Sequence, residues 1–182
     1  MSTVRPGSAP PVGGAFELVD HDGRPVTHET FRGAYALVFF GFTHCRVVCP
    51  RALGRLSTVL GLLGPDAARM QPLYITVDPE RDHPAVMKAF LARWPGFLGL
   101  TGSRERIEAA KVAFHVFARR RDDPEDPDGY AVPHTAITYV LDPEGVCVDH
   151  FTDALSADEV AERLRALIAR GHQLNNASEA GE

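Results

Sequence analysis

The chain has 182 residues, of which 45% are apolar and 24% charged, a composition typical of one globular domain with a sizeable core. Its formal net charge of −5 at pH 7 gives no bulk electrostatic support to a nucleic-acid partner. Three cysteines are too few for a disulfide-stapled scaffold, and a domain of this size does not need one.

Both ends of the chain are polar. Residues 1–13 are rich in Pro, Gly and Ser and predict a flexible lead-in, and residues 172–182 predict an equally flexible tail. The opening residues lack the apolar run of a signal peptide, and no stretch approaches the roughly 18–20 apolar residues of a transmembrane helix. We therefore expect one domain over residues 14–171, with no membrane tether visible in this chain.

The first half of the domain predicts a hairpin, a central strand and a helix. Residues 15–27 indicate two short strands around an Asp22-Gly23 turn. Residues 35–42, YALVFFGF, form a continuous apolar run that is typical of a fully buried strand. Apolar residues then recur at helical spacing from Leu53 to Leu63, and Gly64-Pro65 ends this helix.

The second half continues the alternation. Strands are predicted at residues 72–77, 134–141 and 145–151, and helices at 83–94, 103–114 and 156–170. Ser103 and Ser156 are the expected N-caps, with Glu159 completing a capping box. This order predicts an α/β fold with a central mixed sheet and helices on both faces, which a thioredoxin-like arrangement fits.

Two cysteines, Cys45 and Cys49, lie at the junction between the central strand and the following helix. Unpaired backbone N–H groups and the helix dipole favour anions there, so we expect both cysteine pKa values to be lowered. If the first helical turn already includes Cys45, the spacing of four residues directs both sulfurs to one face.

This pair has three interpretations. It can form a redox couple, although the usual motif for disulfide exchange has one residue fewer between the cysteines. It can supply two thiolates to a soft ion such as copper(I). It can also be two small buried residues at a crowded junction.

A metal site needs a third ligand, and histidine is the obvious type among the eight in the chain. Six of them lie in turn-like, terminal, helix-end or strand contexts that suggest other roles: His21, His28, His83, His115, His150 and His172. His44 is adjacent to Cys45, but neighbouring side chains diverge. His134 follows Pro133 at the expected start of a strand beside the central one, which makes it a candidate.

Four segments occur in an order and spacing that resemble the Sco/SenC family of copper proteins over residues 14–170. They are FFGFTHCRVVCP, ITVDPERDHP, FLGLTG and YAVPHTAITYVLDPEG. The resemblance implies a thioredoxin-like fold and a copper metallochaperone that serves assembly of the copper A centre of cytochrome c oxidase. Some members of the family act instead as thiol–disulfide reductases or redox sensors.

Carried over by motif, the resemblance implies that Cys45 and Cys49 are thiolate ligands and His134 the imidazole ligand of copper(I) or copper(II). Asp78 matches a family position near the site, outside the ligand set. The chain has Arg46-Val47-Val48 where the family usually has Pro-Asp-Val, and Pro133 where the family usually has Asp. We expect Arg46 to lower the thiolate pKa values further.

The resemblance also implies partners and a location. The partners are a copper ion and either a cytochrome c oxidase subunit or another copper chaperone, and the location is the extracytoplasmic, periplasmic side of a bacterial membrane. The alternative function is a thiol–disulfide oxidoreductase, with Cys45 attacking and Cys49 resolving, or a redox or copper sensor. Cys147 is expected to be a buried inert thiol, and the charged loop at 119–129 is either a solvated excursion or a docking loop.

Overall fold

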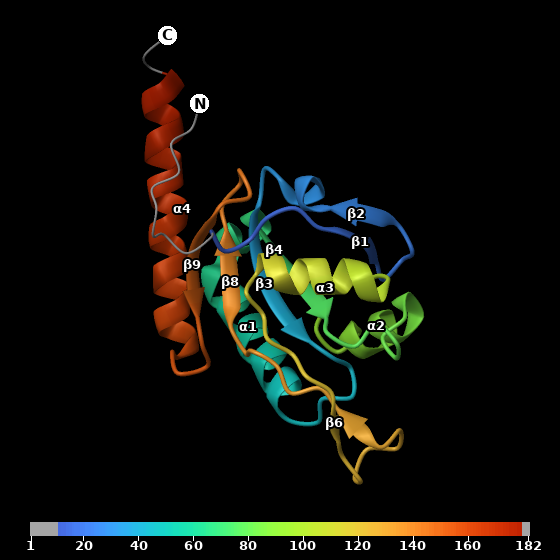
Figure 1. Ribbon diagram of the computed structural model, residues 1–182. Coiled ribbons are helices and arrows are strands. Elements are labelled where there is room, and N and C mark those ends of the chain that lie inside the picture. The colour runs from blue at the N-terminus through green and yellow to red at the C-terminus, as the bar shows by residue number, and fades with distance from the viewer. Residues whose placement is uncertain (1–10, 180–182) are drawn as a thin grey trace.

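A computed structural model describes residues 11–179 (Figure 1). The described residues form a seven-stranded mixed sheet in the order β2-β1-β5-β4-β3-β8-β9, and a separate two-stranded sheet of β6 and β7. The strands are β1 (Glu17–Asp20), β2 (Pro25–Thr27), β3 (Tyr35–Gly41), β4 (Met70–Thr76), β5 (Leu98–Thr101), β6 (Arg121–Asp122), β7 (Tyr130–Ala131), β8 (Thr138–Leu141) and β9 (Cys147–Phe151). The helices are α1 (Val48–Leu63), α2 (Pro84–Leu91), α3 (Arg104–Ala113) and α4 (Ala157–Glu179), with 3-10 turns η1 (His28–Phe31) and η2 (Gly64–Arg69).

Strand β3 organises the domain because all seven of its residues are buried. It pairs in parallel with β4 and antiparallel with β8. Side chains of a strand alternate between faces, so Leu37 and Phe39 pack with α1, α2 and α4, whereas Val38 and Phe40 pack with α3. The mixed sheet with helices on both faces is therefore as predicted.

The largest difference from the expected elements lies before β8. The strand predicted from residue 134 begins only at Thr138. Residues 133–135 instead pair with residues 117–119: the Thr135 N–H donates to the Phe117 carbonyl (2.9 Å), and the Arg119 N–H donates to the Pro133 carbonyl (3.1 Å). His134 therefore lies in an irregular segment that leads into β8.

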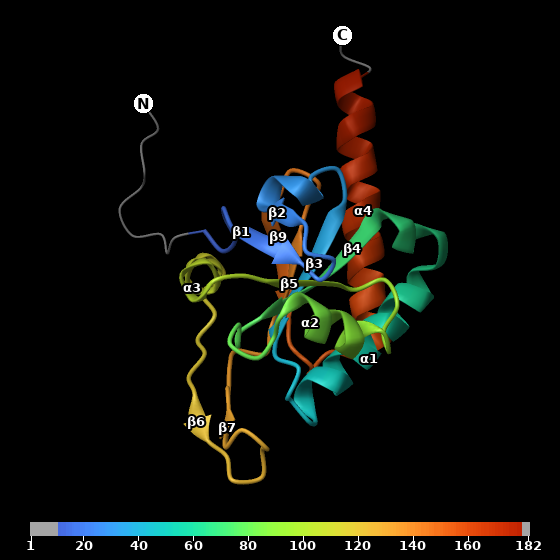
Figure 2. The ribbon, with the colours of Figure 1, turned by 90° about the vertical axis from the view of Figure 1, so that its right-hand side faces the viewer.

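Several short elements carry no strong sequence signal. Strand β5, the β6–β7 hairpin and the two 3-10 turns were not expected, because each is only two to six residues long. The charged loop predicted at 119–129 contains β6 and the turn of this hairpin, β7 follows directly after the loop, and the hairpin extends away from the main sheet (Figure 2).

The two predicted flexible ends have different outcomes. Residues 1–10 lie outside the described residues. The prediction of an irregular tail from residue 172 is wrong for residues 172–179, since α4 continues to Glu179. The amphipathic part of α4 begins with the predicted capping box, in which Ser156 and Glu159 exchange hydrogen bonds. Adding residues to a helix that has already formed costs little free energy, even for polar residues.

Replacing Gly41 by alanine should destabilise the protein by roughly 1–3 kcal/mol, because the core beside β3 is already full. A Cβ at Gly41 would lie 2.7 Å from two ring carbons of Tyr74, which is itself fully buried. The matched control is Gly61→Ala in α1, where nothing lies within 4 Å of an added Cβ. This control should gain about 0.5–1 kcal/mol from helix propensity. Urea unfolding of both variants measures the difference, and equal effects would contradict the packing of Tyr74 on Gly41.

Candidate metal centre

The candidate site lies where β3 ends and α1 begins. Cys45 belongs to the connecting loop, and its N–H donates to the carbonyl of Phe42 (3.1 Å). Cys49 is the second residue of α1 and is fully buried. The assumption that Cys45 lies in the first helical turn is therefore wrong, because Val47 is the N-cap of α1.

The Cys45 sulfur occupies the position of a capping side chain at the start of α1. Val47 provides no side-chain hydrogen bond to the helix. The Cys49 N–H donates to the Cys45 sulfur (3.3 Å) instead. A hydrogen bond from the Cys49 thiol, followed by backbone N–H groups of Cys49, Val47 and Val48, lowers the pKa of Cys45 to about 5. Cys45 is therefore a thiolate at neutral pH.

Cys49 has the opposite character. Its hydrogen bond to the Cys45 sulfur is the largest cause that raises its pKa well above the ordinary value, and burial raises the pKa further. The hydroxyl of Tyr74 lies beside Cys49 and is the side chain that lowers this pKa in part. The expectation that both cysteine pKa values are lowered is thus wrong for Cys49, because two adjacent sulfurs share one low-energy negative charge.

Arg46 does not act on the cysteines as expected. Its guanidinium forms ion pairs with Asp123 (2.9 Å) and Glu125 (3.4 Å) in the β6–β7 hairpin. The dominant effects on the pKa of Cys45 are hydrogen bonds from Cys49, Val47 and Val48 together with burial, and Arg46 is not among them. Arg46 therefore joins the cysteine loop to the hairpin.

His134 presents one ring nitrogen as a possible ligand. Its Nδ1 lies 2.9 Å from the Val132 carbonyl, an arrangement that fixes the tautomer with the proton on Nδ1. Its Nε2 is buried and has no hydrogen-bond partner within the described residues. The ring packs edge-on against Phe42, with 5.8 Å between ring centroids. Phe42 thus contacts both His134 and, through its carbonyl, Cys45.

The structure brings the two cysteines together but leaves His134 apart from them. Within the described residues, the ligand atoms of Cys45, Cys49 and His134 are not all within 4.8 Å of one another. A trigonal metal with bonds of about 2.0–2.3 Å requires ligand atoms separated by about 4 Å. Shared coordination therefore requires the imidazole to approach the sulfurs.

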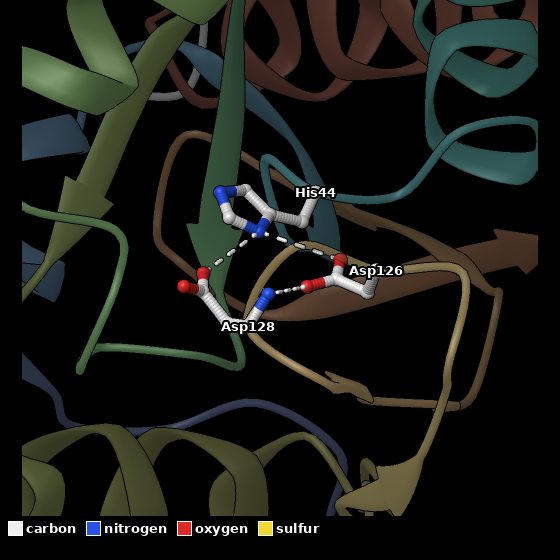
Figure 3. A group of neighbouring side chains, drawn as sticks. All are labelled: His44, Asp126 and Asp128. Carbon is white, nitrogen blue, oxygen red and sulfur yellow. Dashed lines mark hydrogen bonds and ion pairs between the residues drawn. The ribbon is translucent and has the colours of Figure 1, made fainter.

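Three other groups do meet this distance: His44, Asp126 and Asp128 (Figure 3). The His44 Nδ1 points between the two carboxylates, 3.5 Å from Asp126 and 3.6 Å from Asp128. Arg81 already provides a cation at both carboxylates, 2.9 Å from Asp126 and 3.5 Å from Asp128. This arrangement fits an ion-pair network that fastens the hairpin to the loop preceding Cys45.

Asp78 lies near this network. Its carboxylate accepts hydrogen bonds from Arg81 (2.6 Å) and Tyr130 (3.1 Å), so its contacts hold the hairpin. The sequence reasoning missed Asp82, which is fully buried and accepts hydrogen bonds from Thr43 and Thr76. Burial raises the pKa of Asp82, and those hydrogen bonds oppose the shift. Asp82 is the last residue of VDPERD, directly after a buried strand, and this position could have indicated that its carboxylate is held at the end of the sheet.

Cys147 lies away from these groups, in β9. It is half-buried, so it is less buried than expected, while burial raises its pKa, as for an unreactive thiol. No helix in the described part of the chain combines the length and the apolar content of a membrane span.

The donor atoms fit a soft metal ion. Two sulfurs, one of them anionic, and a neutral imidazole nitrogen suit copper(I) better than magnesium or calcium, which prefer oxygen. The Nε2 of His134 supports the third ligand, because it is buried and without a hydrogen-bond partner within the described residues, while Nδ1 faces the Val132 carbonyl and leaves the lone pair of Nε2 available.

Comparison with known proteins agrees with this chemistry. The family model SCO1/SenC matches residues 4–169. The mouse protein "Protein SCO2 homolog, mitochondrial" is 40% identical over 164 residues, which are 88% of this chain and 64% of the mouse protein. The chain thus spans less than two thirds of that relative.

Among the solved structures similar to this chain, several hold copper. Bradyrhizobium japonicum ScoI with copper bound is 38% identical, with a TM-score of 0.78 over 85% of this chain and 98% of that one. Yeast Sco1 with copper bound is 32% identical, with a TM-score of 0.80 over 88% and 90%. These structures confirm the predicted thioredoxin-like fold, and the match over nearly the whole domain shows that the chain belongs to the SCO1/SenC family.

Proposed function

We propose that this chain is a copper metallochaperone that holds one copper ion through Cys45, Cys49 and His134. The observation that carries the proposal is the paired donor set: a thiolate at neutral pH beside a second sulfur, and a buried imidazole nitrogen without a partner. Copper-bound relatives of the same fold support it. Copper is the cargo here, so no bond of a substrate is made or broken.

Copper binding in this proposal proceeds from the sulfurs. The Cys45 thiolate is ready to act as a ligand, whereas the Cys49 thiol must first lose the proton that it donates to Cys45. Metal binding therefore releases a proton, and copper affinity falls as the pH decreases. The buried surroundings of Cys49 exclude water and make its neutral form the resting state.

His134 completes the site by moving. Its segment is held by hydrogen bonds between Thr135 and Phe117 and by a bridge between His134 and Ala118. These contacts are few and partly exposed, which is typical of segments that open at low cost. Transfer to a partner then reverses the order: an incoming thiolate or imidazole replaces His134 first, and the buried Cys49 last.

The proposed destination is the copper A centre of cytochrome c oxidase, reached through an oxidase subunit or from another copper chaperone. We propose that this exchange takes place on the extracytoplasmic side of a membrane. The mitochondrial name of the mouse relative is compatible with this location. Val47 and Pro133 stand where the family usually has Asp, and Arg46 adds a cation where the family usually has Pro, so the surface offered to that partner differs in charge.

A second candidate function is thiol–disulfide exchange, favoured by the contrast between the two cysteine pKa values. The Cys45 thiolate would attack a partner's disulfide, which forms a mixed disulfide and releases the partner's first thiolate. Cys49, after losing its proton, would then attack the Cys45 sulfur, which forms the Cys45–Cys49 disulfide and releases the partner's second thiolate. A copper or redox sensor would use the same residues and differ in partner affinity.

Titration of the reduced protein with copper(I) against a chromophoric chelator should show one tightly bound equivalent. His134→Ala should weaken binding by roughly 100-fold, because even the loss of an outer-shell partner commonly costs 10–100-fold in metal affinity. His150→Ala is the matched control, since that exposed histidine lies in β9. Equal affinities of the parent and the His134 variant would contradict the ligand set, while disulfide exchange should be unaffected by either change.

The ultraviolet absorbance of thiolates should show one thiolate in the copper-free protein that forms near pH 5 and persists to alkaline pH. Cys49→Ala should move this transition to higher pH, because the thiol of Cys49 is the largest cause that lowers the pKa of Cys45. Cys147→Ala is the control and should leave the transition unchanged. A first transition near the ordinary thiol value would contradict the capping role of the Cys45 sulfur.

A further inference from the structure

An open groove of about 850 Å³ lies beside His134 and is formed by the paired segments 117–121 and 133–135. Ala118 pairs directly with His134, so these two residues share one face of the ladder. Phe117, Arg119 and Pro133 line the groove together with His134, and all three are exposed.

The groove has the composition of a contact surface. The side chain of Phe117 is 73% exposed, the most exposed aromatic residue of the described chain. Aromatic residues and arginine are the types enriched at the centres of protein interfaces. Two further exposed apolar residues, Val47 and Val48, lie between the two cysteines. A partner that covers the copper ligands would have apolar surface to bury in the groove and at the cysteines.

The charges of the groove are positive although the whole chain is acidic. Arg119 and Arg121 are exposed, and within the described residues neither guanidinium has an ion pair or hydrogen-bond partner. Arg120, between them, forms an ion pair with Glu80 (3.2 Å). Its guanidinium also stacks on the ring of Tyr130, with 3.5 Å between the guanidinium carbon and the ring centroid.

Few acidic groups oppose these charges. Asp122 also borders the groove, while Asp123 and Glu125 are held by Arg46 on the neighbouring part of the hairpin. Two unpaired arginines therefore remain available beside an exposed phenylalanine.

We propose that this groove is the docking surface for an acidic segment of a copper-exchanging protein, with carboxylates at Arg119 and Arg121 and an apolar anchor against Phe117. The proposal deepens the proposed function, because it names the chemistry of the partner that reaches His134. Charge complementarity at such a surface speeds encounter and fixes the register of two proteins. A segment seated there has His134 at its edge, where ligand exchange would begin.

The test uses the copper-free protein, so that its result does not depend on copper binding. Two fluorescent peptides serve as probes: one alternates glutamate and glycine around a single tryptophan, and its twin has lysine in place of glutamate. Fluorescence anisotropy should show binding of the glutamate peptide and much weaker binding of the lysine twin. Arg119→Glu with Arg121→Glu should weaken binding of the glutamate peptide about tenfold, as expected for two reversed surface ion pairs.

The matched control is Arg32→Glu with Arg170→Glu, which changes the net charge equally at exposed positions outside the groove. It should leave the affinity unchanged, while Phe117→Ala should weaken it. Equal losses in the two double variants would overturn the proposal, since the effect would then be one of net charge. Binding of the lysine twin as tight as that of the glutamate peptide would also overturn it. Copper(I) affinity of the Arg119/Arg121 variant should match the parent, which separates failure of the docking surface from failure of the copper site.

Discussion

The interaction on which the site depends is the contact of the Cys45 sulfur with the open start of α1. An ordinary helix cap would be a serine or aspartate oxygen, but here the side chain of Val47 has no acceptor atom and the Cys45 sulfur takes that place. The same N–H groups that need an acceptor hold Cys45 as a thiolate. Helix capping and the proposed metal-ligand role of Cys45 thus depend on the same contacts, and the hydrogen bond between the two sulfurs raises the pKa of Cys49.

The sheet and the hairpin place the rest of the site around this sulfur. Because β3 and β8 are antiparallel, the chain entering β8 lies at the carboxyl end of β3, beside Phe42. The hairpin before it is fastened to the cysteine loop by Arg46 and by the network of His44, Arg81 and Asp126. The loop that carries Cys45 and the segment that carries His134 are therefore connected through ion pairs across the end of the sheet.

Sequence patterns predicted the long elements well, because an unbroken apolar run such as 35–42 and a capping box such as Ser156–Glu159 act locally. They also selected the cysteine pair and His134 as candidate ligands. They failed where tertiary contacts decide. The pairing of 133–135 with 117–119 makes β8 begin later than predicted, and Arg46 forms ion pairs with the hairpin carboxylates. The pKa is lowered for Cys45 alone, although it was expected to be lowered for both cysteines. The buried Asp82 was missed because its partners, Thr43 and Thr76, become neighbours only after folding.

The most direct test of the central claim is X-ray absorption at the copper edge of the copper(I)-loaded protein. The account predicts a three-coordinate ion with two sulfur ligands and one nitrogen ligand whose outer-shell scattering is that of an imidazole. That imidazole scattering should disappear in His134→Ala and persist in His150→Ala. A spectrum of the parent protein with sulfur ligands alone, or one unchanged in His134→Ala, would contradict the assignment of His134 and with it the closing movement proposed here.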